Sequence, residues 1–179
     1  MINRIIKTTL LIVVFSCVHS VSAETPLNGY LSTQFGMSAQ DARKAFENDG
    51  IVFSSSETAD GDYLIFAKRE QSWITSDLLY VFPSNSDSLA LIIEIFPGLL
   101  DSKPVRKELI EKLGEPSSDN YPELVLKGMQ DAEVIPAGVN NLAVWNVSTD
   151  QTDREARVMS LDKYVRVEYI DNKLMKGNK

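Results

Sequence analysis

Two apolar stretches, Ser76–Pro83 (SDLLYVFP) and Leu89–Phe96 (LALIIEIF), decide the fold. The residues between them, Ser84–Ser88, are turn-formers and match the length of a β-hairpin loop. One face of the second stretch is entirely aliphatic: Leu89, Leu91, Ile93 and Ile95. The other face carries one carboxylate among apolar residues: Ala90, Ile92, Glu94 and Phe96. A strand that is apolar on nearly both faces is typical of the centre of a sheet.

A helix is expected before this hairpin and another after it. A capping box at Ser38 begins a helix over Ala39–Asp49, and Gly50 ends that helix in a left-handed conformation. Pro104 suits the first turn of the second helix, where an amide hydrogen is not needed, and Gly114 ends it.

Further strands are predicted from short runs of β-forming residues: Ile51–Phe53, Tyr63–Ala67, Asn141–Ser148, Ala156–Leu161 and Lys163–Ile170. Ser117–Asn140 has a weak pattern, in which Glu123–Leu126 favours a strand and Ile135–Gly138 a loop. The basic tail from Asn172 is expected to fray.

The order of these elements predicts an α+β fold in a single domain of residues 24–179. Each half is a helix that ends in glycine, followed by antiparallel strands, which predicts two tandem helix-plus-antiparallel-sheet units in a two-layer sandwich. The sub-repeats would span about 35–98 and 99–171, and Ala42-Arg43-Lys44 matches Val105-Arg106-Lys107 loosely. Chance similarity between the halves remains the alternative.

Residues 1–23 have the pattern of a signal peptide. Arg4 and Lys7 precede a short apolar run, Leu10–Phe15, and Val21-Ser22-Ala23 is a small-residue cleavage site. The apolar run is far shorter than the ~18 residues of a membrane-spanning helix. We therefore expect a periplasmic or secreted protein with no transmembrane segment in the mature chain.

Cleavage after Ala23 removes Cys17 and His19, the one cysteine and the one histidine of the chain. Their loss excludes disulfides, thiol or imidazole nucleophiles, a Ser-His-Asp triad and ordinary zinc sites. In the alternative, Val14-Phe15-Ser16-Cys17 resembles part of a lipobox, and the mature protein is a lipoprotein anchored to the membrane through Cys17.

The net charge of the chain limits the classes of partner that it can bind. The net charge is −7, and it becomes −9 once Arg4 and Lys7 are removed. So acidic a chain repels nucleic acid and anionic lipid, whereas a basic protein remains a possible partner.

No motif of catalytic or cofactor-binding chemistry stands out. The carboxylate groups Asp60/Asp62 and Asp150/Asp153/Glu155 do not follow a calcium-loop order, so we interpret them as solvated turn residues. We expect no catalytic residue, no cofactor and no metal site. Trp73 follows the polar run Lys68–Ser72 and is the candidate partner contact, because burial of its ring is not assured.

Phe35-Gly36-Met37-Ser38, followed by a capped helix, resembles the start of the small SmpA/OmlA (BamE-like) envelope modules. The exit Leu113-Gly114-Glu115-Pro116 looks like the one common in such modules, and the tandem arrangement is similar to the β-lactamase inhibitor proteins. This resemblance implies a helix packed on an antiparallel sheet. No binding residue of either family has a matched position here.

Together these features predict an exported, non-catalytic periplasmic or envelope protein that binds another envelope or secreted protein. One alternative is a periplasmic inhibitor or immunity protein against a hydrolase or toxin. The other is a lipid-anchored accessory protein of the outer membrane.

Overall fold

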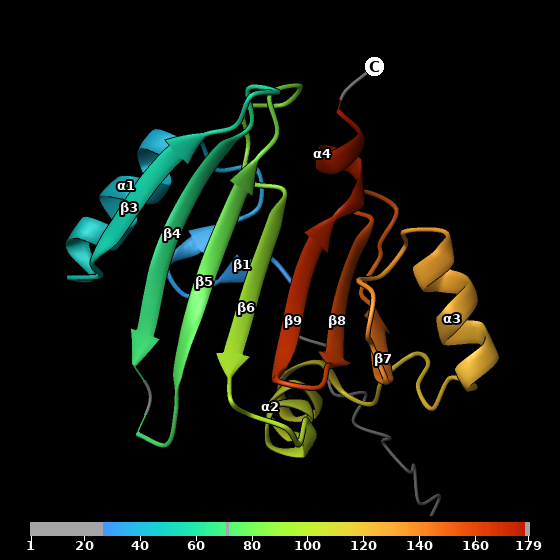
Figure 1. Cartoon of the computed structure of the whole chain (residues 1–179). Helices are drawn as coiled ribbons and strands as arrows, with labels where there is room; N and C mark the ends of the chain where they lie inside the picture. Colours follow the sequence, from blue (N-terminus) through green and yellow to red (C-terminus); the bar gives the residue numbers. More distant parts are fainter. Residues whose placement is uncertain (1–26, 71, 178–179) are drawn as a thin grey trace, which may run out of the picture.

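The computed structural model describes residues 27–70 and 72–177, so the predicted signal peptide, with Cys17 and His19, lies outside the described residues. The fold is α+β, with more sheet than helix. Seven antiparallel strands form one sheet in the order β3-β4-β5-β6-β9-β8-β7 (Figure 1). Their bounds are β3 Phe53–Glu57, β4 Tyr63–Glu70, β5 Thr75–Phe82, β6 Leu91–Pro97, β7 Asn141–Asn146, β8 Arg154–Ser160 and β9 Tyr164–Asp171.

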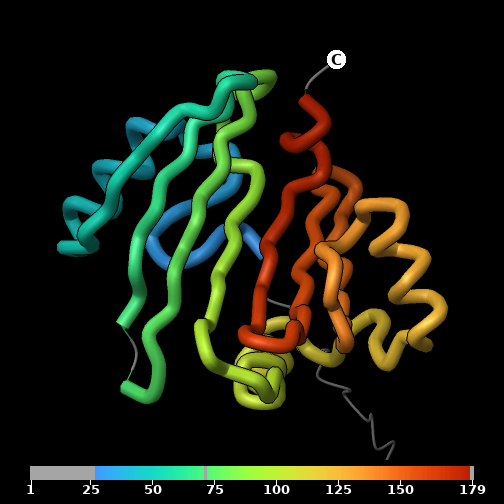
Figure 2. Tube along the Cα trace, in the orientation of Figure 1, coloured from blue at the N-terminus to red at the C-terminus, as the bar shows by residue number. Residues whose placement is uncertain are grey.

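The predicted hairpin and its central strand are confirmed. β5 and β6 pair antiparallel, and β6 is the fourth of the seven strands, between β5 and β9. The chain order places β3–β6 on one side of the sheet and β7–β9 on the other, and β6 and β9 join the two sets (Figure 2).

The two predicted helices are also present. α1 spans Ala39–Asn48, and the Ser38 hydroxyl accepts a hydrogen bond from the amide of Asp41, as a capping box requires. Gly50 has φ +67°, the left-handed conformation predicted for the end of this helix. α2 spans Lys103–Leu113, with proline in its first turn.

Three local predictions are wrong. The strand predicted at Ile51–Phe53 begins only at Phe53 and continues to Glu57, because its pairing with β4 includes the serines that follow. The segment predicted to contain a strand at Glu123–Leu126 forms a helix instead, α3 (Glu123–Asp131). Leu126 is buried on one face of that helix against the sheet, which outweighs the weak β preference of four residues. The tail from Asn172 begins with a short helix, α4 (Asn172–Lys176), because the Asp171 carboxylate accepts hydrogen bonds from the amides of Lys173 and Leu174.

The hydrophobic core is divided between the two faces of the sheet. The larger cluster lies on the face covered by α1, α2 and a small hairpin, β1 (Gly29–Tyr30) with β2 (Thr33–Gln34). A smaller cluster lies on the other face, where Leu126, Ile135 and Val139 pack on β7 and β8. In Figure 1, where β1 lies behind the strands, no labelled helix lies in front of β4, β5, β6 or β9.

Candidate protein-binding surface

The part of the sheet face that the segment around α3 leaves uncovered is apolar across four adjacent strands. We call this surface the platform; it consists of Leu64 and Phe66 on β4, Leu79 and Val81 on β5, Leu91, Ile93 and Ile95 on β6, and Ile170 on β9.

The strand register aligns the platform in rows. Leu79 lies between Phe66 and Ile93, and Leu91 lies between Val81 and Ile170. Because alternate side chains of a strand share one face, these rows form a single patch.

None of the platform residues belongs to either hydrophobic cluster. Phe66 is 42% exposed, and Leu64, Leu79, Leu91 and Ile95 are partly exposed, whereas Val81, Ile93 and Ile170 are only 8–9% exposed. A contiguous, partly exposed apolar patch of this kind is typical of an interaction site.

A row of paired charges borders the platform on the β9 side. Arg166 Nη2 lies 2.5 Å from Glu168 Oε1, and Arg157 Nη1 lies 3.7 Å from Glu168 Oε2. Arg157 also pairs with Glu155 and donates a hydrogen bond to the carbonyl of Val134. Beyond this row, the segment around α3 packs on β7 and β8, so this segment borders the platform on the β9 side.

The covered face contains the main concentration of buried polar groups, which the sequence did not reveal as a cluster. Glu94 of β6 is 1% exposed. Its carboxylate accepts hydrogen bonds from the hydroxyls of Tyr30 (2.6 Å) and Ser76 (2.5 Å). Arg69 Nη1 lies 3.5 Å from the same carboxylate and also donates to the Tyr30 hydroxyl, which completes what we call the Glu94 cluster.

The pKa shifts of the tyrosines and of the arginine in and around the Glu94 cluster indicate that these residues stabilise the fold. Burial, together with the negative charge of Glu94, raises the pKa of Tyr30 and Tyr80 well above the ordinary value of 10, and burial raises the pKa of Tyr169 likewise. Burial lowers the pKa of Arg69, but Tyr30, Glu94 and Glu108 outweigh it and raise the pKa overall. At neutral pH the phenols therefore remain donors and the guanidinium remains charged.

A cavity of about 480 Å³ between β1 and the end of α2 reaches the edge of the Glu94 cluster at Tyr30, Arg69 and Tyr169. Its charges are already matched, because Arg69 pairs with Glu94 and Glu108, and Lys112 pairs with Glu108 at 2.7 Å. The cavity therefore offers a charged ligand no free counter-ion at these positions.

Trp73, the one residue that the sequence proposed as a partner contact, lies in the connection between β4 and β5 and is 49% exposed. One side of its ring stacks on Phe96, with ring centroids 6.3 Å apart and planes 9° apart. It lies apart from the platform, because Phe96 belongs to the core of the covered face.

The carboxylates considered for acid–base or calcium chemistry lie in turns or in ion pairs. Asp62 accepts a hydrogen bond from the amide of Ser84, Asp153 accepts one from the hydroxyl of Ser148, and Glu155 pairs with Arg157. Within residues 27–70 and 72–177, no three Cys, His, Asp or Glu side chains gather as metal ligands. The same residues include no helix with the length and apolar character needed to cross a bilayer.

Comparison with known proteins found no family model that matches the chain. It found no match among curated proteins and none among solved structures.

The sequence did show the alternation of β6, but not which of its faces is covered. Leu91, Ile93 and Ile95 have the pattern of a core face, yet they form the platform. The signal that would have found the Glu94 cluster is the one carboxylate on the other face of this strand, since a charge on a central strand must find partners.

Proposed function

We propose that this chain is an exported, non-catalytic periplasmic or envelope protein that binds another protein through the platform. The observation that carries this proposal is the contiguous apolar surface of β4, β5, β6 and β9, which belongs to neither core cluster. A bound partner would remove partly exposed aliphatic and aromatic side chains of the platform from water. This burial stabilises the complex by about 25 cal/mol per Å² of apolar surface.

Two further observations favour the binding of a protein over the electrostatic attraction of a charged ligand. The charges beside the platform are paired with one another, so little net charge acts on a partner there. A hydrophobic centre with a polar rim is the usual anatomy of a protein interface. Trp73 remains a second proposed contact, because the residue is 49% exposed.

The tandem organisation also remains a proposal. The sub-repeats of about 35–98 and 99–171 would each contribute one helix to the covered face, α1 and α2. The second half contains α3 in addition, on the opposite face. The export route and the likeness to SmpA/OmlA envelope modules rest on the sequence patterns alone.

Site-specific photo-crosslinking in the native host tests the platform. A photoreactive phenylalanine derivative replaces Leu79 or Leu91, and in a control chain it replaces Leu124, which is 82% exposed on α3. We expect one discrete crosslinked protein from both platform positions and none from the control. Equal crosslinking from all three positions, or none from the platform, would reject the proposal.

Fractionation of the same cells tests the location. The proposal requires the chain in the envelope or the medium, with Glu24 as its N-terminus for the soluble form or acylated Cys17 for the anchored form. Full-length chain in the cytosol would contradict export.

A further inference from the structure

The two edges of the sheet differ in whether their backbone groups are paired. At the β7 edge, Val144 exchanges two backbone hydrogen bonds with Ser118, at 2.8 and 3.2 Å, and the Ser117 hydroxyl accepts one from the amide of Asn146. At the β3 edge, no backbone hydrogen bond from another described segment reaches the outer side of the strand.

The register shows which groups of β3 point outward. Thr58 donates its amide hydrogen to the carbonyl of Asp62, so the residues that bond to β4 are Ser54, Ser56 and Thr58. The alternate residues, Phe53, Ser55 and Glu57, therefore direct their amide and carbonyl groups away from the sheet. An unprotected edge of this kind is a template for one more strand.

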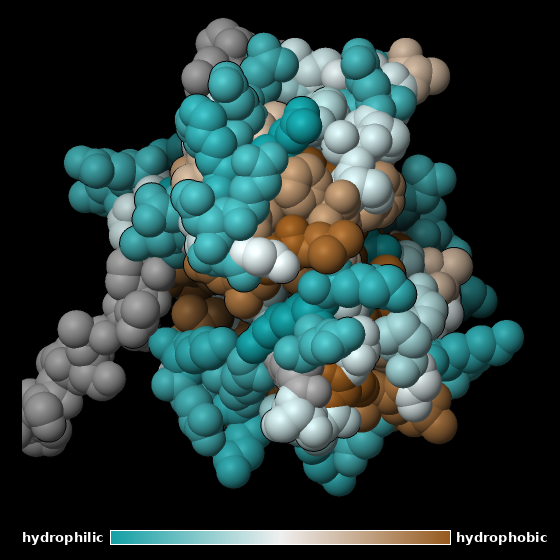
Figure 3. Space-filling view, turned by 90° about the vertical axis from the view of Figure 1, so that its left-hand side faces the viewer, coloured by the Kyte–Doolittle hydropathy of each residue, from teal (hydrophilic) through white to brown (hydrophobic). Residues whose placement is uncertain are grey.

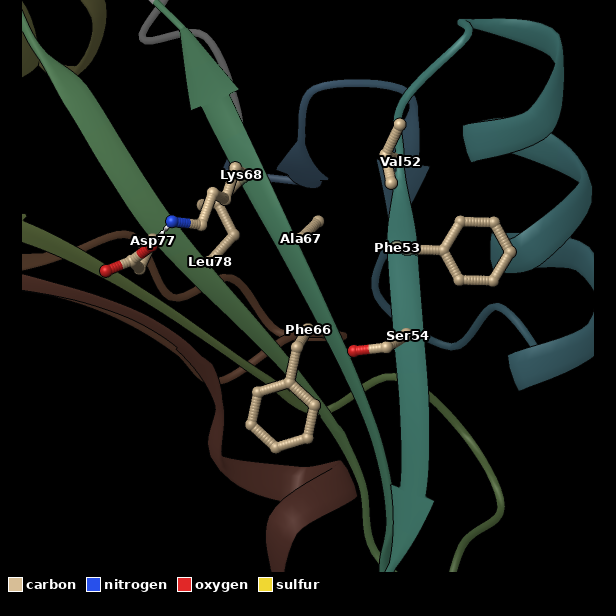
Figure 4. Close-up of a pocket in the computed structure, with 8 residues that line it drawn as sticks. All are labelled: Val52, Phe53, Ser54, Phe66, Ala67, Lys68, Asp77 and Leu78. Carbon is tan, nitrogen blue, oxygen red and sulfur yellow. Dashed lines mark ion pairs between the residues drawn. The ribbon is translucent and has the colours of Figure 1, made fainter.

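A hollow of about 520 Å³ lies beside this edge, where β4 continues past the start of β3. It is lined mainly by apolar side chains, among them Val52, Phe53, Phe66 and Leu78. Figure 4 shows Phe53 directed toward α1, whereas Ser54 and Phe66 lie on the other side, next to the Lys68–Asp77 ion pair. Val52 is 88% exposed, so an apolar side chain can lie against it.

The surroundings of the edge are acidic. Glu47 and Asp49 lie before β3, and Glu57 and Asp60 lie at its far end. These four carboxylates are exposed, and none has a cationic partner among the described residues. The nearby Lys44 and Lys68 are paired with Asp41 and Asp77, and the guanidinium of Arg43 lies 5.9 Å from the centre of the Phe53 ring, so the four carboxylates outnumber the one described cation near this edge that is not in an ion pair. Figure 3, which views this side, shows hydrophobic surface at the centre with hydrophilic residues around it.

We propose that β3 accepts an extended segment of a partner protein as an eighth strand, and that this segment alternates basic and apolar residues. Its backbone would bond to Ser55 and Glu57, an apolar side chain would enter the hollow at Val52 and Phe66, and its lysine or arginine residues would face the free carboxylates. This inference rests on the proposed protein-binding function and names a further contact for it, separate from Trp73 and from the centre of the platform.

Peptide binding tests the proposal on the whole exported chain. The probe is a blocked peptide of alternating lysine and valine, and the readout is the backbone amide NMR signals of the protein. We expect saturable shifts centred on Ser55 and Glu57. The same peptide with glutamate in place of lysine should bind about tenfold more weakly or worse, because four free carboxylates repel it.

Two variants of one residue separate backbone pairing from side-chain contact. Ser55→Pro removes an outward amide without breaking a bond to β4, and proline is tolerated at such an edge. Ser55→Ala keeps the amide. We expect Ser55→Pro to weaken peptide binding about tenfold, the effect of one lost hydrogen bond plus the ring, and Ser55→Ala to leave it unchanged.

If Ser55→Pro does not fold, the peptide is modified in place of the protein. Two peptides carry N-methyl groups on alternate residues, one on the odd and one on the even positions. Only the peptide whose methylated amides would bond to β3 should lose binding. Equal binding by both Ser55 variants, equal binding by both N-methyl patterns, or equal binding of the lysine and glutamate peptides would overturn the proposal. Crosslinking from Leu79 and Leu91 would be unaffected by that result, so failure here is distinct from failure of the platform.

Discussion

The two faces of β6 have similar side chains and opposite environments. On one face, Ile92, Glu94 and Phe96 are buried under α2 and the β1–β2 hairpin or against their neighbours. On the other, Leu91 and Ile95 are partly exposed and Ile93 is 8% exposed, and all three belong to the platform, outside both core clusters. The covered face is the one with the charge, so hydrophobicity alone does not identify the core. What matters is whether other segments supply partners, as Tyr30, Ser76 and Arg69 do for Glu94.

The largest expected difference between the faces comes from two isoleucines of the same strand. Ile92 is 0% exposed on the covered face, and Ile95 is partly exposed on the platform. We expect Ile92→Ala to lower the free energy of unfolding by about 4 kcal/mol, because it leaves a cavity in packed surroundings. Ile95→Ala should lower it by about 1 kcal/mol.

Urea denaturation of both variants measures this difference, when the same dependence of the unfolding free energy on urea concentration is used to analyse both. Equal losses would mean that the platform is covered in the isolated protein.

The next comparison concerns two neighbouring cations on opposite faces of β4. Arg69 faces Glu94 across the covered side, whereas Lys68 pairs with Asp77 at 3.4 Å and is 75% exposed. We expect Arg69→Met to cost about 3 kcal/mol, because it leaves a buried carboxylate without its cation. Lys68→Met should change stability by less than about 0.5 kcal/mol.

The same denaturation experiment applies, and Glu94→Gln in the Arg69→Met background should recover part of the loss. A small effect of Arg69→Met would show that the hydroxyls of Tyr30 and Ser76 suffice for Glu94.

The pH dependence of stability reports on the covered face. Burial raises the folded-state pKa of Tyr30, Tyr80 and Tyr169 above the ordinary value of 10. Below pH 10 these phenols are protonated in both states and contribute no slope. Above it the unfolded chain releases protons that the folded chain keeps, so stability falls by about 1.4 kcal/mol per pH unit for each tyrosine.

Urea denaturation at several pH values above 10 gives the free energy of unfolding as a function of pH. We expect this free energy to fall less steeply with pH for Tyr30→Phe than for the unsubstituted chain. An unchanged slope would contradict the burial of the Tyr30 hydroxyl in the Glu94 cluster.

The smallest expected effect compares two buried tyrosines at neutral pH. The Tyr30 hydroxyl donates to Glu94 at 2.6 Å, whereas the Tyr80 hydroxyl is buried without a hydrogen-bond partner among the described residues. We expect Tyr30→Phe to lower the free energy of unfolding by about 1.5 kcal/mol and Tyr80→Phe to leave it unchanged or raise it by about 0.5 kcal/mol. Thermal denaturation of the two variants checks this. A loss for Tyr80→Phe equal to that for Tyr30→Phe would indicate a partner for Tyr80.

Local features were determined by the sequence alone. The cap at Ser38, the proline in the first turn of α2, the left-handed Gly50 and the hairpin loop after β5 all depend on residues within a few positions of one another. The alternation of β6 also identified its central place in the sheet. Such features are predictable because their energetics involve neighbours in the chain.

Only the tertiary structure decided which face of β6 is covered, which edge of the sheet is left open and what surrounds Glu94. Tyr30 and Glu94 are 64 positions apart, so their contact depends on the packing of the β1–β2 hairpin against the sheet. Arg69 and Glu94 are 25 apart, and their contact depends on the pairing of β4 and β6 with β5. The helix α3 likewise forms where Leu126 is buried against β7 and β8, against a weak local pattern. Local sequence patterns do not predict contacts between distant segments, because each such contact depends on how the whole sheet is assembled.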